Sequence, residues 1–487
     1  MNNKSFYITT TLPYVNNDPH VGFAMEIIRA DTIARAKTLQ GYDVFFNTGT
    51  DEHGQKLLTD AQKSGKDVKE YVDYYADKFK GLINLLGISE SVNFIRTTDQ
   101  HHESAAQELW KIVDKNGYIY KKNYKAKYCV GCELEKTDSE LNEDGRCPVH
   151  PDRDIELRDE ENYFFAFSKV APLLEKLYSE KPLLVIPEFR FNEMKAFLSR
   201  GLEDFSISRL KSKMSWGVPV PGDEDHVMYV WFDALTNYIS TLGWPENIEK
   251  FEKYWINGNP TQYCGKDNTR QQSMMWQGML LAANLPTTEH IIINGFINSG
   301  GQKMSKSLGN VINPYDIVAI FAGVAGDLSS DVLRYYLLRH MNSFEDSDMT
   351  MESINEAYQS GLANGIGNLT SRIMTLSEIH CEGFDDLPNV EHSKEINKAI
   401  EEFDLQKAMN QIWQNIGDVD QKIQITKPFS VVKEDKDAGA AIIDSLVSDL
   451  YGIAVSLAPF MPKTSERIIE CIRRNKKPET PLFNRLG

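Results

Sequence analysis

Apolar and polar residues alternate along the first part of the chain in a way that predicts strands and helices in turn. Runs rich in β-branched and aromatic residues indicate strands, and apolar residues at helical spacing indicate helices. The expected elements are a strand at 6–15, a helix at 21–40, a strand at 43–47, a turn at 49–54, and helices near 59–86 and 99–116. Strands that alternate with helices favour a parallel sheet covered by helices.

This alternation is interrupted between residues 117 and 225, which hold a cysteine cluster, an acidic loop and short mixed segments. We interpret this part as an insertion. The α/β pattern resumes at Met228–Asp233 and Glu289–Gly295, and from about residue 353 the apolar spacing is helical to the end. The pattern therefore predicts a split α/β domain, an inserted module and a C-terminal all-α bundle.

Composition and charge exclude several classes of protein. The chain has 487 residues, which is too long for a single core. It carries 53 Lys and Arg against 70 Asp and Glu, a net charge of -17, so bulk charge is not expected to coat nucleic acid. The N-terminus lacks a signal-peptide core, and no apolar run reaches about 18 residues. We expect a cytoplasmic protein without a membrane span.

Three cysteines and a histidine lie close together within the expected insertion. Cys129 and Cys132 are separated by fourteen intervening residues from Cys147 and His150. Paired thiolate and imidazole ligands are typical of tetrahedral zinc, and four protein ligands leave no open position, so we predict one structural Zn²⁺ per chain. Reduced cysteines by chance are the alternative, but they do not explain the histidine. The acidic loop from Glu133 to Arg146 is expected to repel phosphate.

His101 and His102 are a second candidate for metal binding, on the helix expected near 99–116. Adjacent side chains on a helix point in different directions. We therefore expect both histidines to lie on the surface and to bind no metal.

Two segments have residues that suit phosphate binding. Lys303 and Lys306 lie in the Gly- and Ser-rich run 300–309, where their charges could stabilise the oxygens of a polyphosphate. His20 and Gly22 open the first expected helix, whose free N–H groups suit a phosphate. Either segment alone is more often an ordinary turn. Their combination favours a nucleotide site.

These two segments resemble the signatures of the class I aminoacyl-tRNA synthetases, His-Ile-Gly-His and Lys-Met-Ser-Lys-Ser. The second is complete, whereas in the first a phenylalanine replaces the second histidine. The resemblance implies an ATP-dependent enzyme in which His20 contacts the transition-state phosphate, with Lys303 and Lys306 on pyrophosphate. The ATP-binding residues that it implies are His20, Gly22, Phe23, Gly265, Lys266, Asp267, Lys303, Met304, Ser305, Lys306 and Ser307.

Further segments, 12–14, 49–54 and 229–238, are similar to the methionyl-tRNA synthetase branch of this class. The resemblance implies that Asp51 holds the ammonium group of L-methionine, that aromatic residues contact its thioether, and that Arg209 lies on the active-site rim. Plain core packing is the alternative for the aromatic residues. The implied methionine-binding residues are Leu12, Tyr14, Asp51, Trp231, Ala234, Leu235, Tyr238, Asn268 and Gln272. At the last two positions many relatives have isoleucine and histidine.

By the same resemblance, the C-terminal helices are expected to bind the anticodon of tRNA(Met). Asn368 and Arg372 lie one helical turn apart, which suits hydrogen bonds to splayed bases. Phe429 stands where the family usually stacks a tryptophan on a base, with core packing as the alternative. Residues 346–487 hold 15 basic and 23 acidic residues, so we expect recognition through bases and a shallow salt dependence.

Together these features predict a Rossmann-type catalytic domain that is split by a zinc-knuckle module and followed by an all-α bundle. The expected enzyme ligates L-methionine to tRNA(Met) through methionyl-adenylate, uses ATP with Mg²⁺, and is a monomer. Another class I ligase or nucleotidyltransferase and a catalytically silent tRNA-binding paralogue are the alternatives. The expected boundaries are 1–116 and 226–320 for the catalytic halves, 117–225 for the insertion with its knuckle at 129–150, 321–352 for the linker, and 353–487 for the bundle.

Overall fold

The computed structural model describes residues 4–136, 140–304, 309–383 and 393–486. The chain divides into two compact units, each discontinuous in sequence. The first unit comprises residues 1–18, 42–80 and 91–293, and the second comprises 19–41, 81–90 and 294–487.

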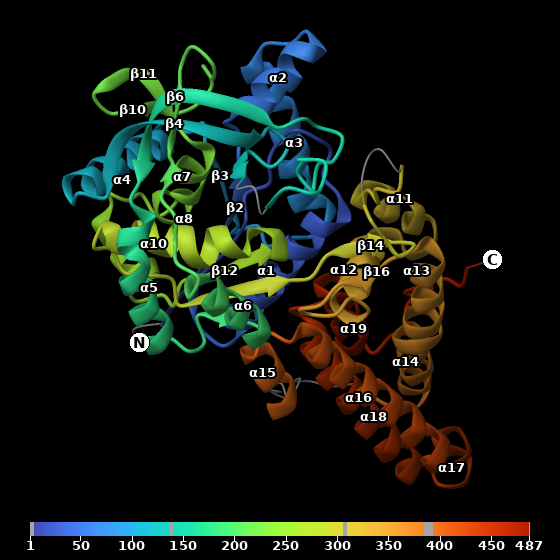
Figure 1. The fold of residues 1–487 in the computed structure, drawn as a ribbon. Helices are drawn as coiled ribbons and strands as arrows, with labels where there is room; N and C mark the ends of the chain where they lie inside the picture. The colour runs from blue at the N-terminus through green and yellow to red at the C-terminus, as the bar shows by residue number, and fades with distance from the viewer. Residues whose placement is uncertain (1–3, 137–139, 305–308, 384–392, 487) are drawn as a thin grey trace. The chain divides into compact units, whose positions relative to one another are not determined.

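A six-stranded sheet lies in the first unit (Figure 1). In order across the sheet, its strands are β3 (Asn93–Arg96), β2 (Asp43–Thr50), β1 (Ser5–Thr10), β12 (Thr261–Gly265), β13 (His290–Asn294) and β7 (Val185–Ile186). The pairs β1–β2, β2–β3, β1–β12 and β13–β7 are parallel. Residues 6–10 of β1 are buried, which explains their largely apolar character.

Two strands of this sheet differ from the sequence interpretation. β7 lies within the segment interpreted as an insertion, yet it pairs with β13. A strand of two residues leaves no periodic signal, so pattern alone could not reveal it. β2 continues to Thr50, beyond the predicted end at residue 47, because Asn47–Thr50 pair with Asn93–Arg96 of β3. The turn predicted at 49–54 therefore begins later.

Two antiparallel sheets form most of the part interpreted as an insertion. One has the order β5 (Leu134–Lys136), β4 (Ile119–Cys129), β6 (Glu156–Phe165) and β8 (Phe205–Ser206). The other has the order β10 (Pro219–Val220), β11 (Asp223–Met228) and β9 (Ser208–Leu210). The long pair β4 and β6 lies along the top of Figure 1.

Helices precede and follow these strands along the chain, and at two places they differ from the predicted pattern. The helix expected near 59–86 is two helices, because Gly65 ends the first in a left-handed conformation (φ 71°). Residues 230–235 form a helix and no strand. The helices are α2 (Gln55–Ser64), α3 (Val68–Leu85, whose end belongs to the second unit), α4 (Gln100–Lys115), α5 (Phe167–Glu180), α6 (Glu188–Leu198), α7 (Val230–Leu235), α8 (Asn237–Ser240), α9 (Ile248–Phe251) and α10 (Gln277–Ala282), with shorter 3₁₀ or π segments η2 (Glu252–Ile256), η3 (Lys266–Asn268) and η4 (Gln271–Trp276).

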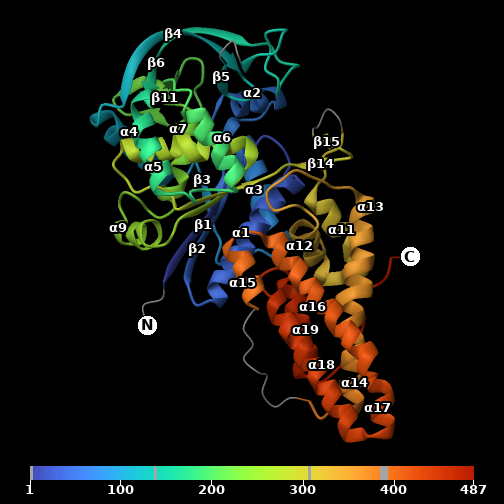
Figure 2. The same cartoon turned by 60° about the horizontal axis from the view of Figure 1, so that its bottom comes forward.

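The second unit is mainly helical. Its small sheet has the order β15 (Gln302–Lys303), β14 (Ile297–Ser299) and β16 (Ser347–Asp348). Its helical elements are α1 (Val21–Leu39), α11 (Pro314–Ala325), η5 (Gly326–Leu328), α12 (Ser329–Arg339), α13 (Met351–Ala357), η6 (Tyr358–Gly367), α14 (Asn368–His380), α15 (Lys394–Glu401), α16 (Leu405–Thr426), α17 (Pro428–Glu434), α18 (Lys436–Leu457) and α19 (Pro462–Arg473). α16 and α18 run side by side in both views (Figures 1 and 2). The predicted fold class, a parallel α/β sheet with a helical C-terminal region, is confirmed.

Among the described helices, α18 is long and apolar enough to cross a membrane. Its buried residues include Ile443, Leu446, Leu450 and Leu457, and it packs against α14, α16, α17 and α19. The core helix of a soluble bundle has the same length and composition. The expectation of no membrane span stays a prediction.

A buried ion pair joins α1 to α12 within the second unit. Asp31 and Arg334 are fully buried, and Nη1 of Arg334 lies 2.8 Å from Oδ2 of Asp31. Nε of Arg35 lies 2.8 Å from the same oxygen. Arg334 also donates to the carbonyls of Phe460 at 2.7 Å and Pro459 at 3.0 Å. Burial lowers the pKa of Arg334, and the charge of Asp31 opposes this. The fold therefore depends on keeping these charges paired.

Candidate functional site

In the first unit, most predicted substrate-binding residues lie near the carboxyl ends of three neighbouring strands. The strand order reverses between β1 and β12, because β2 and β3 extend to one side and β13 and β7 to the other. Ligands of open α/β sheets bind at such a reversal, beyond the carboxyl ends of the strands. Leu12 and Tyr14 follow β1, Asp51 follows β2, and Gly265–Asp267 ends β12. This edge is therefore the candidate substrate site of the unit.

Asp51 is buried at this edge. It forms an isolated parallel bridge with Tyr14, and its backbone N–H donates to the carbonyl of Pro13 at 2.9 Å. The residue is 7% exposed, yet Oδ1 accepts no hydrogen bond from any described residue. Burial, followed by the charges of Asp233 and Glu133, raises the pKa of Asp51 well above its usual value. Such a carboxylate can bind a cation that replaces its lost hydration.

Glu133 lies beside Tyr14, although the sequence analysis grouped it with a loop expected to repel phosphate. It is 5% exposed, and its Oε1 accepts hydrogen bonds from the Tyr14 hydroxyl at 2.8 Å and the Lys56 backbone at 2.9 Å. Gly54 (φ 120°) makes room for this contact, since a Cβ there would lie 2.5 Å from Oη of Tyr14. The only sequence signal for Glu133 is its position directly after the cysteine ligand Cys132.

Helices α7 and α8 carry four of the residues predicted to bind methionine. Trp231, Ala234, Leu235 and Tyr238 follow helical spacing, and the last three are buried. Trp231 is partly buried, and its indole Nε1 has no hydrogen-bond partner among the described residues. The Tyr238 hydroxyl accepts a hydrogen bond from Nε2 of Gln272 at 2.5 Å. These helices therefore combine apolar surface with two polar aromatic groups.

Gln272 belongs to a chain of buried amides that starts at Tyr238. Its Oε1 accepts from Nε2 of Gln262 at 2.7 Å, and Oε1 of Gln262 accepts from the Thr288 hydroxyl at 2.5 Å. Both polar ends of the Gln272 side chain are thereby engaged, so it fixes the position of the Tyr238 hydroxyl. Asn268 is only partly buried, in η3.

Two residues are more buried than their sequence context predicted. Arg209, predicted on a rim, is 2% exposed, and its guanidinium lies over the rings of Tyr128 and Tyr229 at 5.0 and 4.6 Å. The prediction that His102 lies on the surface is wrong. His102 is fully buried, with Nε2 2.8 Å from Oδ1 of Asp233. Its neighbour in sequence is exposed, as expected.

The second unit holds both segments predicted to bind phosphate. His20 is exposed and caps α1, where its Nδ1 accepts from the Gly22 backbone at 3.1 Å. Lys303 is exposed at the end of β15, with its ammonium 4.8 Å from the centre of the Phe296 ring. Phe23 and Met304 are partly buried, and the predicted residues Ser305, Lys306 and Ser307 lie outside the described residues.

The residues predicted to bind the anticodon lie on α14 and α17 of the second unit. Asn368 is exposed, and Arg372, one turn further along, forms an ion pair with Asp420 of α16. Phe429 is 47% exposed, so the alternative of core packing is wrong for this residue. Ile425, at the end of α16, is also exposed. These helices therefore offer aromatic, apolar and polar groups to a ligand.

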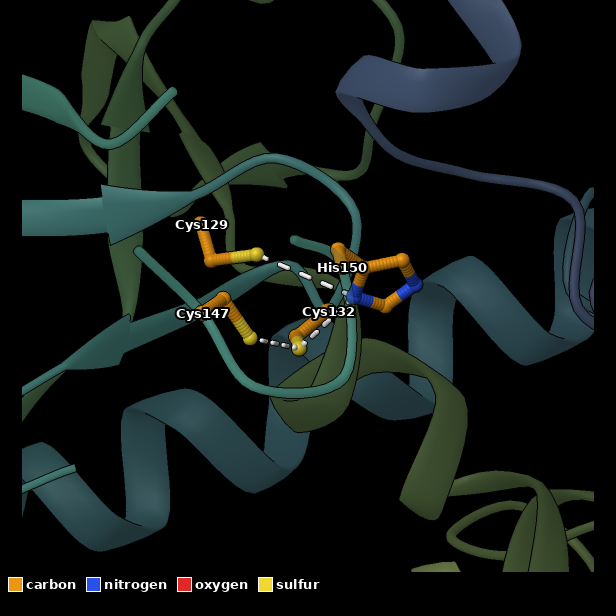
Figure 3. Close-up of side chains that lie close together, drawn as sticks. All are labelled: Cys129, Cys132, Cys147 and His150. Carbon is orange, nitrogen blue, oxygen red and sulfur yellow. Dashed lines mark hydrogen bonds between the residues drawn. The ribbon is translucent and has the colours of Figure 1, made fainter. Parts of the chain in front are cut away.

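The four predicted metal ligands lie close together in the first unit (Figure 3). The ligand atoms of Cys129, Cys132, Cys147 and His150 all lie within 4.8 Å of one another. Sγ of Cys132 lies 3.4 Å from Sγ of Cys147 and 3.2 Å from Nδ1 of His150. Gly131 lets the imidazole approach, since a Cβ there would lie 2.5 Å from the ring. Three thiols and one imidazole at this spacing fit one tetrahedral metal ion.

Comparison with known proteins agrees with this fold. A family model described as "tRNA synthetases class I (M)" matches residues 6–156 and 135–374. A methionine–tRNA ligase of Thermotoga maritima is 40% identical over 99% of this chain and 77% of its own length. One from Brucella suis is 34% identical over 97% of this chain and 92% of its own length. The solved structure of Mycobacterium tuberculosis methionyl-tRNA synthetase in complex with methionyl-adenylate has a TM-score of 0.89 and 32% identity, covering 99% of both chains.

The family model of the class I tRNA synthetases matches most of the chain, which includes the parallel sheet. The sequence matches cover nearly the whole chain at more than 30% identity. The chain belongs to the methionyl-tRNA synthetase family.

Proposed function

We propose that this chain catalyses the ATP-dependent ligation of L-methionine to tRNA(Met). The observation that carries the proposal is the buried carboxylate of Asp51, whose Oδ1 has no hydrogen-bond partner among the described residues. The ammonium group of an amino acid is a cation that suits this carboxylate. Trp231 and Tyr238 supply aromatic groups that suit the soft sulfur of a thioether. Leu12, Ala234 and Leu235 add apolar surface.

The reaction then has two steps. The methionine carboxylate attacks the α-phosphorus of ATP, which forms methionyl-adenylate and releases pyrophosphate. The 3′-terminal adenosine hydroxyl of the tRNA next takes the methionyl group, and AMP leaves. Positioning and charge stabilisation account for the first step, with His20 assigned to the transition-state phosphate and Lys303 and Lys306 to pyrophosphate. ATP is expected to bind as its Mg²⁺ complex, with Gly265–Asp267 near the nucleotide.

Charging of tRNA tests this function directly. Purified protein with ATP, Mg²⁺, methionine and a tRNA(Met) transcript is expected to form methionyl-tRNA, detected by the shift of the charged tRNA in an acid gel. Omission of ATP is the control and is expected to abolish the shift. Retained tRNA binding without charging would contradict the proposal and support a catalytically silent tRNA-binding protein.

The metal of the cysteine cluster is proposed to be one structural Zn²⁺ per chain. Three thiolates and one imidazole suit zinc and leave no position open for substrate. Replacing Cys147 with Ser is expected to reduce bound zinc from about one per chain to almost none, because structural sites need all four ligands. Mass spectrometry of the metal content measures this. Cys381→Ser, outside the cluster, is the control, and equal metal loss in both variants would contradict the assignment.

Phe429 is proposed to stack on a base of the anticodon, with Asn368 and Arg372 hydrogen-bonding to neighbouring bases. Phe429→Ala is expected to weaken tRNA(Met) binding roughly tenfold, because the stacking area is lost. Filter binding measures the dissociation constant. Phe429→Trp, which keeps an aromatic ring, is the control and is expected to retain binding. Unchanged affinity in the Ala variant would remove Phe429 from the interface.

The acidic charge of the chain bears on how it binds tRNA. The net charge of -17 implies few phosphate contacts, so tRNA binding is expected to depend only weakly on salt. The protein is proposed to act as a cytoplasmic monomer without a membrane span. Its sedimentation velocity, measured with and without tRNA, tests the monomeric state.

A further inference from the structure

Three carboxylates face Asp51, and each of them has a partner of its own. They are Asp233, Glu133 and Glu52. Glu52 is fully buried, and Nε and Nη2 of Arg96 lie 2.6 and 2.8 Å from its two oxygens. Glu133 accepts hydrogen bonds from a hydroxyl and a backbone N–H. The partners of Asp233 are two histidines.

Asp233 lies between two buried histidines. Its Oδ2 is 2.6 Å from Nδ1 of His53, and its Oδ1 is 2.8 Å from Nε2 of His102. Nδ1 of His102 lies 2.8 Å from the Ser240 hydroxyl. His53 follows Asp51 by two residues, and its backbone N–H hydrogen-bonds to the Asp51 carboxylate. Hydrogen bonds therefore link Ser240, His102, Asp233 and the ring of His53, which lies two residues from Asp51 in the chain.

Negative charges surround the imidazole of His53. Besides Asp233, it faces Glu103, whose Oε1 lies 3.9 Å from Nε2, and Glu52. Trp216 contacts the ring in an edge-to-face arrangement, with 5.5 Å between the ring centres. Burial lowers the pKa of His53, but these carboxylates, Asp233 foremost, raise it above its usual value. Although burial opposes it, the two histidines lower the pKa of Asp233 to about 2. The carboxylates therefore favour the protonated form of His53, and the histidines favour the ionised form of Asp233.

We propose that His53, Asp233 and His102 form a hydrogen-bonded relay that limits the effect of the Asp233 charge on Asp51, so that Asp51 can pair with the ammonium group of the substrate. The relay rests on the proposed function of Asp51. The charge of Asp233 raises the pKa of Asp51. A positive charge on His53 offsets the charge of Asp233, and without it the repulsion that favours the neutral acid of Asp51 would be larger. A neutral acid does not pair with ammonium. His53 and His102 are thus positioning residues that act through two carboxylates.

The variant His53→Asn removes the positive charge and keeps a donor close to Asp233. The pKa of the Asp51 carboxyl is expected to rise by about one unit, measured by ¹³C NMR titration of the ligand-free protein. Comparison with Asp51→Asn assigns the signal. The acid limb of kcat/KM for methionine in ATP–pyrophosphate exchange is expected to move upward as well, with KM for ATP unchanged. His101→Asn, at an exposed position, is the matched control and is expected to leave both titrations unchanged.

The double variant His53→Asn/Asp233→Asn separates charge from packing. It removes the source of repulsion, so the Asp51 titration is expected to return toward that of the wild type. An unshifted titration in His53→Asn, or an equal shift in the single and double variants, would overturn the relay. Absence of methionine-dependent exchange with the wild-type protein would instead refute the proposed function. The NMR titration would still test the relay, because it needs no substrate.

Discussion

Replacing Asp51 with Asn is expected to lower kcat/KM for methionine by about 100-fold or more in ATP–pyrophosphate exchange. Removing one member of a buried charge pair costs about 2–5 kcal/mol, and about 1.4 kcal/mol corresponds to a tenfold change. The loss is expected mainly in KM for methionine, because Asp51 is proposed to contact the amino acid and not the nucleotide. KM for ATP is expected to stay within about twofold of the wild type.

Competition between methionine and its deaminated analogue tests the assignment of Asp51 more specifically. If Asp51 binds the ammonium group, the wild type is expected to discriminate strongly against the deaminated analogue in competition with methionine. Asp51→Asn is expected to lose much of this discrimination. A variant with wild-type KM for methionine, or with equal losses for methionine and ATP, would contradict the assignment.

Replacing Asp31 with Ala is expected to lower the free energy of unfolding by about 3–5 kcal/mol, because it leaves the buried charge of Arg334 without its partner. Arg334 is fully buried, and after this change its neighbours include backbone carbonyls, a hydroxyl and the more weakly coupled charge of Asp331. Arg35 would add repulsion, since it also pairs with Asp31. Urea denaturation, followed by circular dichroism, measures the change.

A surface ion pair of the same unit provides the control for this prediction. Arg467 lies 3.0 Å from Asp327, but both side chains are about half exposed. Arg467→Ala is therefore expected to cost less than about 1 kcal/mol. Asp31→Asn, which preserves the side-chain volume, is expected to resemble Asp31→Ala. Equal effects at the buried and exposed pairs would contradict the importance of burial.

Features that depend on neighbouring residues could be predicted from the sequence. The spacing of Cys129, Cys132, Cys147 and His150 was sufficient to predict that they converge. The first helix begins directly after His20, as its turn residues and apolar period indicated. In such cases the physical cause, a tight turn or a helix cap, lies within a few residues of the signal.

Features that depend on distant residues were missed. The partner of His102 is Asp233, 131 positions away, and Tyr14 and Glu133 are 119 positions apart. An adjacent pair of histidines and an acid in an acidic loop are both typical of exposed surface. Only tertiary packing buries them, so neither periodicity nor spacing carries the information. The short strand β7 was missed for the same reason, because its partner β13 lies about a hundred residues further on.

Residues 230–235 show a different limit, because their apolar run, where the α/β pattern was expected to resume, is compatible with either a strand or a helix. Six mainly apolar and aromatic residues suit either a buried strand or a short buried helix. The run forms α7, and the helical spacing of Trp231, Ala234 and Leu235 then aligns them with Tyr238. The correction strengthens the candidate site, because a strand would have pointed alternate residues to opposite faces.

Methionine-dependent ATP–pyrophosphate exchange, compared across all twenty amino acids, tests the central claim most directly. Exchange is expected with methionine and only weakly with the other amino acids, because the site combines the carboxylate of Asp51 with the aromatic and apolar residues of α7 and α8. Exchange that is absent with methionine, or as fast with another amino acid, would contradict it.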